Sequence, residues 1–237
     1  MVRVEQLLTV VLLWATTALA PAPAMASDVR QTFARAQRIL DGSTAGELPT
    51  FLDSLKAASS SSEEARMLHS LLWPAWLRQE GRAKEAQMAL DSLRPDDFGS
   101  DPFLAFHWHF GRSEVLRDRE FFDEARAATA KALVIAEANG MERERMAAAI
   151  LTAQVDLRDA QYGRALSEFH KGFVRANELS DARNACRALV GIGTVHFYQA
   201  NSKEAMTYFQ RALDLARAAG ERRVAMNTIY NLAAATA

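Results

Sequence analysis

The stretch ALVGIGTVHFYQANSKEAMTYFQRALDLA, residues 188–216, holds two apolar helical patterns with a short polar break between them. In the second pattern, Ala205, Phe209 and Ala212 stand at i, i+4 and i+7, which places them on one face of a helix. Small residues at the first and third positions let another helix approach closely, and the aromatic ring fills the space between them. The stretch therefore predicts a pair of packed helices.

The same triplet recurs along the chain at a steady interval. Its first member advances by 38, 39, 40 and 40 residues from one copy to the next, which indicates an internal repeat. The copies are Leu48/Leu52/Leu55, Ala86/Leu90/Leu93, Ala125/Thr129/Ala132, Ala165/Phe169/Gly172 and Ala205/Phe209/Ala212. Thr129 stands where the later copies have Phe, so we expect a neighbouring side chain to fill the core beside it.

A second helical segment precedes each triplet, as in CRALVGIGTVHFYQ, residues 186–199. Signals for helix ends agree with this pairing. Gly140 and Gly220 are suited to C-caps, while Asp101 followed by Pro102 is a typical helix start. No stretch alternates as a strand would, so the sequence predicts an all-α chain of antiparallel helix pairs.

These residues resemble the tetratricopeptide repeat (TPR) family. The large, Leu, Gly and Tyr slots of that family's first helix are occupied here by Leu189, Ile192, Gly193 and His196. Its usual repeat is about 34 residues, so a spacing near 40 resembles the variant with longer helices. The resemblance implies a TPR-like α-solenoid of about five repeats and a half.

The resemblance also implies a division of the chain. Residues 1–26 stand apart, 27–100 form two degenerate repeats, 101–222 three well-formed repeats, and 223–237 the first helix of an incomplete sixth. Ile229, Leu232 and Ala233 take the packing slots of that last helix, and we expect the array to continue beyond Ala237. A genuine end, with the Ala-rich helix as a weak cap, is the alternative. In the second repeat, Pro74 is expected to kink its helix.

The first residues have the three-part layout of a secretory signal. MVRVEQ is followed by the apolar run LLTVVLLWATTALA and then by small residues, with Ala24-Met25-Ala26 as the cleavage site. The sequence therefore predicts export, most simply to a bacterial periplasm, with cleavage near Ala26. An uncleaved N-terminal anchor is the alternative.

Composition and motifs favour binding over chemistry. The 28 basic and 29 acidic residues nearly balance, which argues against nucleic acid as a partner and leaves a membrane only as the site of a further C-terminal part. No catalytic, phosphate-binding or metal-binding motif is present, and His107 and His109 point to different sides of a helix. We expect no enzymatic activity, no cofactor and no metal within the chain. Cys186 is expected to be a small buried hydrophobic residue, with a reactive thiol as the alternative.

Stacked helix pairs create an extended surface lined by the first helix of each repeat. In the resembling family, the second, fifth, ninth and thirteenth slots of that helix point into a concave groove. Those slots include Ile150 and Asp118, and the residues expected to contact a protein or peptide partner are His107, Phe110, Glu114, Gln154, Arg158, Arg187, Thr194 and Tyr198. The Lys and Asn residues with which some family members bind a terminal carboxylate are absent.

Two functions from different classes compete. Exported long-repeat arrays resemble the periplasmic sensory portions of bacterial membrane receptors, in which a diguanylate cyclase or histidine kinase follows. That resemblance implies a protein–protein interaction module in signal transduction. The alternative is a free periplasmic scaffold or adaptor without signalling output.

Overall fold

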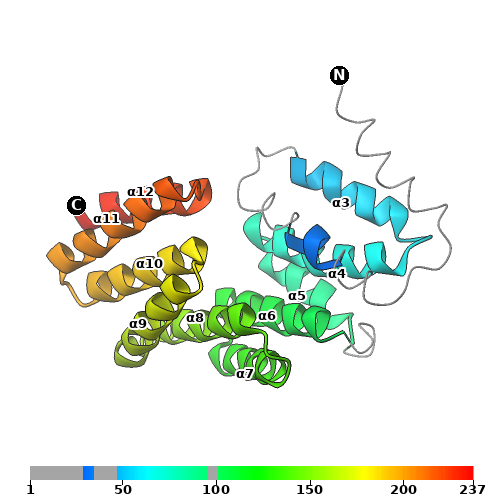
Figure 1. The fold of residues 1–237 in the computed structure, drawn as a ribbon, viewed down its shortest axis with the longest axis horizontal. Coiled ribbons are helices and arrows are strands. Elements are labelled where there is room, and N and C mark those ends of the chain that lie inside the picture. Colours follow the sequence, from blue (N-terminus) through cyan, green and yellow to red (C-terminus); the bar gives the residue numbers. More distant parts are fainter. Residues whose placement is uncertain (1–28, 35–46, 95–100, 237) are drawn as a thin grey trace. The chain divides into compact units, whose positions relative to one another are not determined.

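The computed structural model describes residues 29–34, 47–94 and 101–236 of the 237-residue chain, and within them every regular element is a helix. The chain divides into two units, residues 1–35 and 36–237. In the first unit the described residues 29–34 are helical. The second unit contains α3 (Glu47–Ala58), α4 (Glu63–Gln79), α5 (Ala83–Asp91), α6 (Pro102–Asp118), α7 (Phe122–Ala138), α8 (Glu142–Arg158), α9 (Tyr162–Glu178), α10 (Ala182–Tyr198), α11 (Ser202–Ala218) and α12 (Arg222–Thr236) (Figure 1). The predicted signal, residues 1–26, lies outside the described residues.

The helices from α6 to α11 follow a strict rhythm of 17 helical residues and a three-residue turn. Each turn closes the same way: after α6, the Phe121 amide donates to the Leu116 carbonyl at 2.9 Å and the Glu120 amide to the Arg117 carbonyl at 3.0 Å. This closure needs one residue in the left-handed region, which favours glycine. Gly140 and Gly220 supply it with φ of 61° and 73°, so both predicted C-caps are confirmed.

Helix starts follow ordinary capping chemistry. The Asp101 carboxylate accepts a hydrogen bond from the Phe103 amide at 2.8 Å and Pro102 is the first helical residue, as the sequence predicts. In the degenerate second repeat, α4 continues through the buried Pro74 to Gln79 without interruption, so the proline does not end that helix.

Consecutive helices pack against each other throughout the second unit, and the first helices of neighbouring repeats also touch. α4 contacts α6, α6 contacts α8, α8 contacts α10, and α10 contacts α12. We call the surface that α4, α6, α8, α10 and α12 build together the first-helix face. For the described residues, the predicted all-α stack of helix pairs is confirmed.

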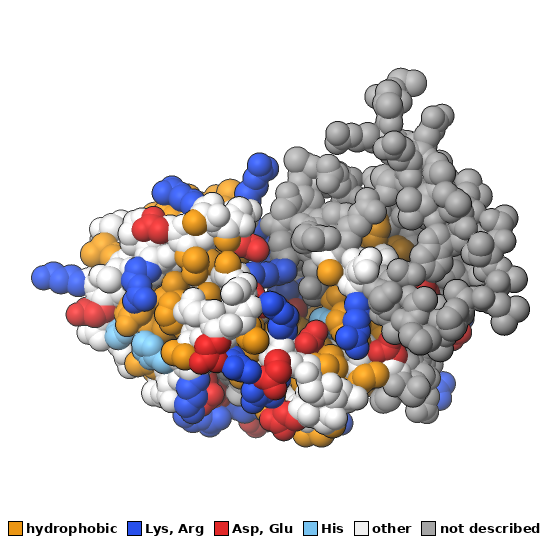
Figure 2. Space-filling view, viewed as in Figure 1, with side chains coloured by type: hydrophobic (Ala, Val, Ile, Leu, Met, Phe, Trp, Pro, Cys, Tyr) orange, Lys and Arg blue, Asp and Glu red, His pale blue; other side chains and the backbone are white. Residues whose placement is uncertain are grey.

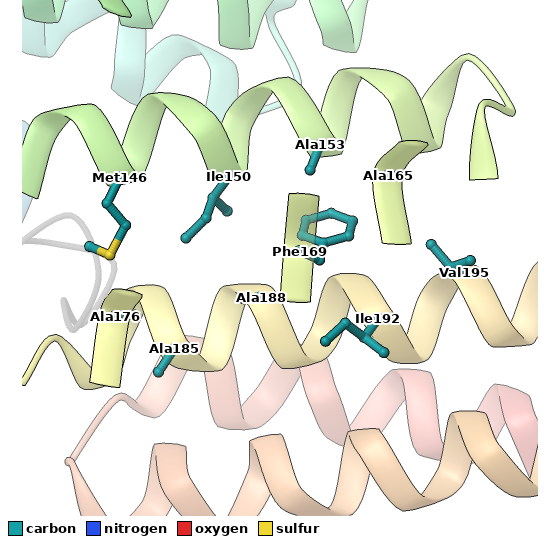
Figure 3. Close-up of a cluster of buried hydrophobic side chains, with 10 residues drawn as sticks. All are labelled: Met146, Ile150, Ala153, Ala165, Phe169, Ala176, Ala185, Ala188, Ile192 and Val195. Carbon is teal, nitrogen blue, oxygen red and sulfur yellow. The ribbon is translucent and has the colours of Figure 1, made fainter. Parts of the chain in front are cut away.

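Side chains of the second helices fill the space between successive first helices. Phe169 of α9 is fully buried in a cluster with residues of α8 and α10, and Figure 3 shows its ring between those two helices. Gly193 of α10 leaves room for Phe209 of α11, since a Cβ there would lie 2.7 Å from two ring carbons. Ile150, expected to point into the groove, is instead fully buried and faces Gly172. Its slot is therefore part of the core.

Thr129 shows how the repeat tolerates a departure from its pattern. Its hydroxyl donates to the Ala125 carbonyl at 2.9 Å and accepts from the buried Ser113 hydroxyl at 2.5 Å. Ser113 stands in α6 where α10 has Gly193. A hydrogen-bonded pair of small side chains thus replaces the aromatic-on-glycine contact, and Ser113 of the neighbouring helix is a side chain that lies beside Thr129.

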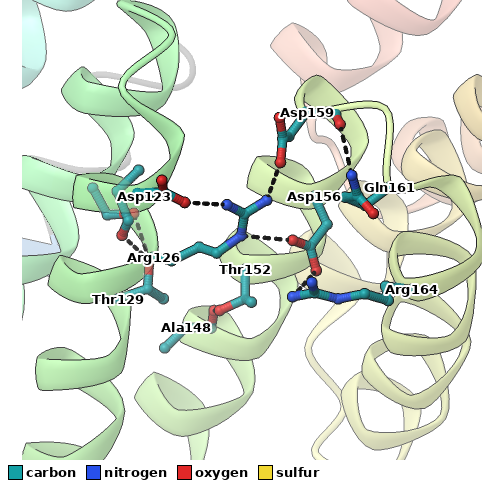
Figure 4. Close-up of polar contacts among 11 residues, drawn as sticks. Asp123, Arg126, Thr129, Ala148, Thr152, Asp156, Asp159, Gln161 and Arg164 are labelled. Carbon is teal, nitrogen blue, oxygen red and sulfur yellow. Dashed lines mark hydrogen bonds and ion pairs between the residues drawn. The ribbon is translucent and has the colours of Figure 1, made fainter.

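A polar network joins α7, α8 and α9 (Figure 4). The Asp156 side chain is only 1% exposed, and its two oxygens lie 3.0 Å from Arg126 Nε and 3.2 Å from Arg164 Nη2. Arg126 also pairs with Asp123 at 3.0 Å and with Asp159. Both oxygens of the buried carboxylate are therefore satisfied, which is what burying a charge requires.

At the C-terminal side, α12 packs on α11 through Leu232, which lies against a cluster that contains Phe209. Ile229 and Ala233 were also expected to occupy packing slots, and for both the expectation is wrong. Ile229 is 47% exposed and Ala233 is exposed as well.

Gly193→Ala is expected to destabilise the protein, because the added Cβ would collide with the Phe209 ring and lie 3.2 Å from the Ala205 carbonyl oxygen. Overpacking costs about 1–3 kcal/mol, and the gain in helix propensity offsets about 1 kcal/mol of that cost, so a net loss of up to about 2 kcal/mol should appear in urea unfolding. Gly111→Ala is the matched control, since its Cβ would meet Leu90 at an ordinary 4.0 Å. It should stabilise by about 0.5–1 kcal/mol, and equal gains from both changes would contradict close packing at Gly193.

Candidate functional site

Three of the predicted site residues meet on the first-helix face. The Gln154 Oε1 atom on α8 accepts from Arg117 Nη1 at 2.7 Å and from Arg187 Nη2 at 3.3 Å. The same Arg187 nitrogen lies 3.9 Å from a carboxylate oxygen of Glu114 on α6. Glu114, Gln154 and Arg187 therefore form one contiguous polar group that links three successive repeats.

Arg78 of α4 extends this group into the degenerate repeat. Its guanidinium lies 3.3 Å from a Glu114 oxygen and 3.2 Å from an Asp118 oxygen. Arg117 completes the arrangement by pairing with Asp118 at 2.7 Å. We call Arg78, Arg117 and Arg187, together with Glu114, Asp118 and Gln154, the arginine cluster. On the surface shown in Figure 2, basic and acidic side chains are interspersed rather than segregated.

The 40-residue period explains why these residues meet. First helices of neighbouring repeats run side by side in the same direction, so residues 40 apart become neighbours on adjacent helices. Arg78 and Asp118 are such a pair, and so are Glu114 and Gln154. Side chains from four helices thereby reach one place although more than 100 residues separate Arg78 from Arg187.

The electrostatics of the cluster are governed by burial and by an excess of cations. Burial alone would raise the pKa of Glu114, but the charges of Arg78, Arg187, Arg117 and Arg223 more than offset it and hold that pKa below its usual value. Burial lowers the pKa of Arg187 to about 10, and Arg183, Arg117 and Arg78 lower it further while Glu114 opposes them. The Glu114 side chain is 16% exposed and that of Arg187 is 23% exposed. The cluster is thus a largely buried, positively charged site.

The other predicted site residues make their contacts elsewhere. The His107 ring lies edge-on to Phe106, which stacks on Phe110 at 5.6 Å. The Thr194 hydroxyl donates to the Val190 carbonyl within α10 at 2.8 Å.

Two further predicted residues are exposed at the C-terminal ends of their helices. Arg158 is about half-exposed and lies 3.5 Å from Glu120. Tyr198 is 56% exposed and stacks on Tyr162 with ring centroids 6.0 Å apart. They remain predictions for a contact surface, separate from the arginine cluster.

Sequence reasoning missed Arg78 and Arg117. Arg78 stands 40 residues before Asp118, so extending the register of the well-formed repeats into the degenerate one would have found it. Arg117 lies one residue before a groove slot, and only its long side chain brings it into the cluster. No periodic signal marks it.

Within the described residues, no group of His, Cys, Asp and Glu could hold a metal ion. None of the described helices is long and apolar enough to cross a membrane. Burial raises the pKa of the Cys186 thiol to about 12, aided by Glu221 and Asp181, so the thiolate needed for reactivity is scarce near neutral pH.

The comparisons with known proteins agree on the fold. No protein-family model matches the chain, and no curated protein matches it in sequence. A Rap protein complexed with Competence and Sporulation Factor superposes with a TM-score of 0.74 at 13% identity, over 92% of this chain and 61% of that one. A STAND protein with a tetratricopeptide repeat sensor, from Pyrococcus horikoshii, gives 0.64 at 16% identity over 84% and 29%.

The apo form of the quorum sensor NprR from B. thuringiensis gives a TM-score of 0.54 at 13% identity, over 88% of this chain and 70% of that one. This chain spans less than two thirds of the length of the Rap protein and of the STAND protein. At these identities the likeness shows the fold, which is that of a TPR-type helical repeat protein, as the sequence resemblance implies.

One buried histidine gives the protein a pH dependence. Burial lowers the pKa of His109 from 6.5 to about 4, aided by the positive charges of Lys131 and Arg112. The folded protein therefore holds a neutral imidazole at a pH where the unfolded chain binds a proton. A group of this kind stabilises the fold above pH 6.5, and its contribution is lost as the pH falls toward 4.

The free energy of unfolding is thus expected to fall by at most about 2 kcal/mol between pH 6.5 and 4.5 on account of His109. His109→Phe keeps a ring of similar size and removes the proton site, so its unfolding free energy should fall less over that range. Urea unfolding of both proteins at the two pH values measures the difference. Identical pH dependences would contradict the buried neutral imidazole.

Proposed function

We propose that the chain is a TPR-type interaction module that binds a protein or peptide segment on the first-helix face. The arginine cluster is the observation that carries this proposal. Charged side chains from α4, α6 and α10 are drawn together with Gln154 of α8 and held largely out of water, although burying like charges side by side is unfavourable. A partner that supplies complementary groups would compensate for that arrangement.

The proteins of similar fold support the same function. One is a Rap protein in complex with Competence and Sporulation Factor, one carries a tetratricopeptide repeat sensor, and one is a quorum sensor. In stacked-repeat proteins generally, the extended surface of the array binds the partner. We therefore assign recognition to this chain and no catalysis, so that any reaction belongs to another domain or protein.

The finer proposal places this module in signalling. The N-terminal layout of residues 1–26 favours an exported protein, and the TPR-like array favours the sensory part of a longer membrane receptor of the diguanylate cyclase or histidine kinase type. Peptide recognition by a free periplasmic adaptor would use the same surface. The two differ in what the native polypeptide contains besides this array.

Binding is tested by selecting peptides from a random displayed library on the purified protein and mapping the best one by hydrogen exchange. Bound peptide should slow amide exchange in α6, α8 and α10 more than in α7, α9 and α11, because the first helices form the binding face. Protection confined to the second helices, or no selected peptide at all, would contradict the proposal.

The cellular setting is tested by the intact mass and fractionation of the protein from its native host. A receptor should appear in the membrane fraction with a mass well above that of residues 27–237. A mass equal to residues 27–237 in the periplasmic fraction would instead support the adaptor. A mass that still includes residues 1–26, in a cytoplasmic fraction, would contradict export.

A further inference from the structure

The arginine cluster differs from an ordinary ion-pair network in its charge balance. Arg78, Arg117 and Arg187 face two carboxylates, Glu114 and Asp118. The side chains of the three arginines are 17%, 13% and 23% exposed, so water screens them only in part. Within the described part of the chain, this leaves positive charge in excess on the first-helix face.

Two further arginines act on the same place. The charge of Arg223 on α12 helps to lower the pKa of Glu114, and that of Arg183 on α10 helps to lower the pKa of Arg187. Both stand at the same position of successive repeats, 40 residues apart. The arginines whose charges act on the cluster therefore come from successive repeats along the stack.

The cluster also leaves one guanidinium without a close acceptor. Arg117 makes contacts of 2.7 Å to both Gln154 and Asp118. Arg187, by contrast, lies 3.3 Å from Gln154, 3.4 Å from Asn184 and 3.9 Å from Glu114. A guanidinium presents paired donors that match a carboxylate, and charge-assisted pairs of this kind are normally about 2.7–2.9 Å apart. Arg187 is thus placed for an acceptor that the described residues do not supply.

We propose that the arginine cluster binds a carboxylate of an acidic peptide segment, with Arg187 as the main donor. This inference rests on the proposed function. The carboxylate accepts two hydrogen bonds from the Arg187 guanidinium and reduces the repulsion among Arg78, Arg117 and Arg187. Phe110 and Val190 lie one helical turn from Glu114 and Arg187 on their own helices and are half-buried. They favour an apolar residue beside the acidic one in the bound segment.

A carboxylate fits this charge balance better than a phosphate does. Glu114 and Asp118 stay in the cluster and repel any anion that enters it. A phosphate monoester carries about −1.5 to −2 charges at neutral pH, so it meets that repulsion more strongly than a singly charged carboxylate. The cluster has one arginine more than it has carboxylates, and this excess suits a single carboxylate.

The test is a set of parallel selections from a random displayed peptide library on the wild-type protein, Arg187→Gln and Lys171→Gln. Lys171→Gln is the matched control, because it also removes one positive charge but from an exposed pair with Glu168 on α9. Wild type and control should enrich peptides rich in Asp and Glu, and Arg187→Gln should lose that preference.

The best wild-type peptide is then synthesised, and its dissociation constant is measured by fluorescence anisotropy. Arg187→Gln should weaken binding by about tenfold or more. Changing the acidic residue of the peptide to its amide should weaken binding to wild type equally but have little further effect on Arg187→Gln. Arg187→Lys, which keeps the charge but loses the paired donors, should lie between the two.

Several results would overturn the inference. Selected peptides without an acidic preference, or with unchanged affinity for Arg187→Gln, would refute it while leaving peptide binding on the first-helix face intact. If a peptide with phosphoserine in place of the acidic residue binds more tightly than the original peptide, the ligand group is a phosphate and not a carboxylate. Failure to select any peptide would refute the proposed function itself. If Arg187→Gln does not fold, the inference is tested with the wild-type protein alone, by comparing its affinity for the acidic peptide and for the amide variant of that peptide.

Discussion

The stack depends on places where a large side chain of one helix presses against a glycine of another. Phe169 lies against Gly191, Phe209 against Gly193, and Ile150 against Gly172. In each case a Cβ on the glycine would overlap the neighbouring side chain, so the helices lie closer together than any larger residue would allow. Interiors packed this tightly deform little, and such contacts fix how far one helix can slide along the next.

The fixed register is what turns a linear sequence into a site. Because each turn restarts the helix after 20 residues, and each pair of helices after 40, residues one period apart are neighbours on adjacent first helices. Arg78 reaches Asp118 and Glu114 lies near Gln154 for this reason. Inserting or deleting one residue in a turn would shift the register of every later helix and separate these groups. The regular turns are therefore as important to the candidate site as the arginines are.

Periodic features of the chain could be predicted from sequence, and features that depend on side-chain length or local replacement could not. The triplets and the caps at Gly140 and Gly220 identified the fold, because they reflect the backbone period directly. The same period indicated Glu114, Gln154 and Arg187. It also placed Ile150 on the surface, and this was wrong. Counting slots does not show that Gly172, which has no side chain, leaves room for Ile150 in the core. Arg117 was missed because a guanidinium can reach a site that its Cα does not face.

A comparison of two charged networks among the described residues shows why one is structural and the other suggests a ligand. In the Asp156 network the buried group is a single carboxylate with an arginine on each oxygen, and the surplus charge sits on Asp123, whose side chain is 97% exposed. Water stabilises that surplus, so the network needs nothing more. In the arginine cluster the surplus is cationic, and it is the buried groups that carry it. Stability alone does not require buried arginines on the first-helix face, because apolar side chains could take their place at lower cost in free energy. This difference is the reason for proposing that the cluster recognises an anionic group on a partner.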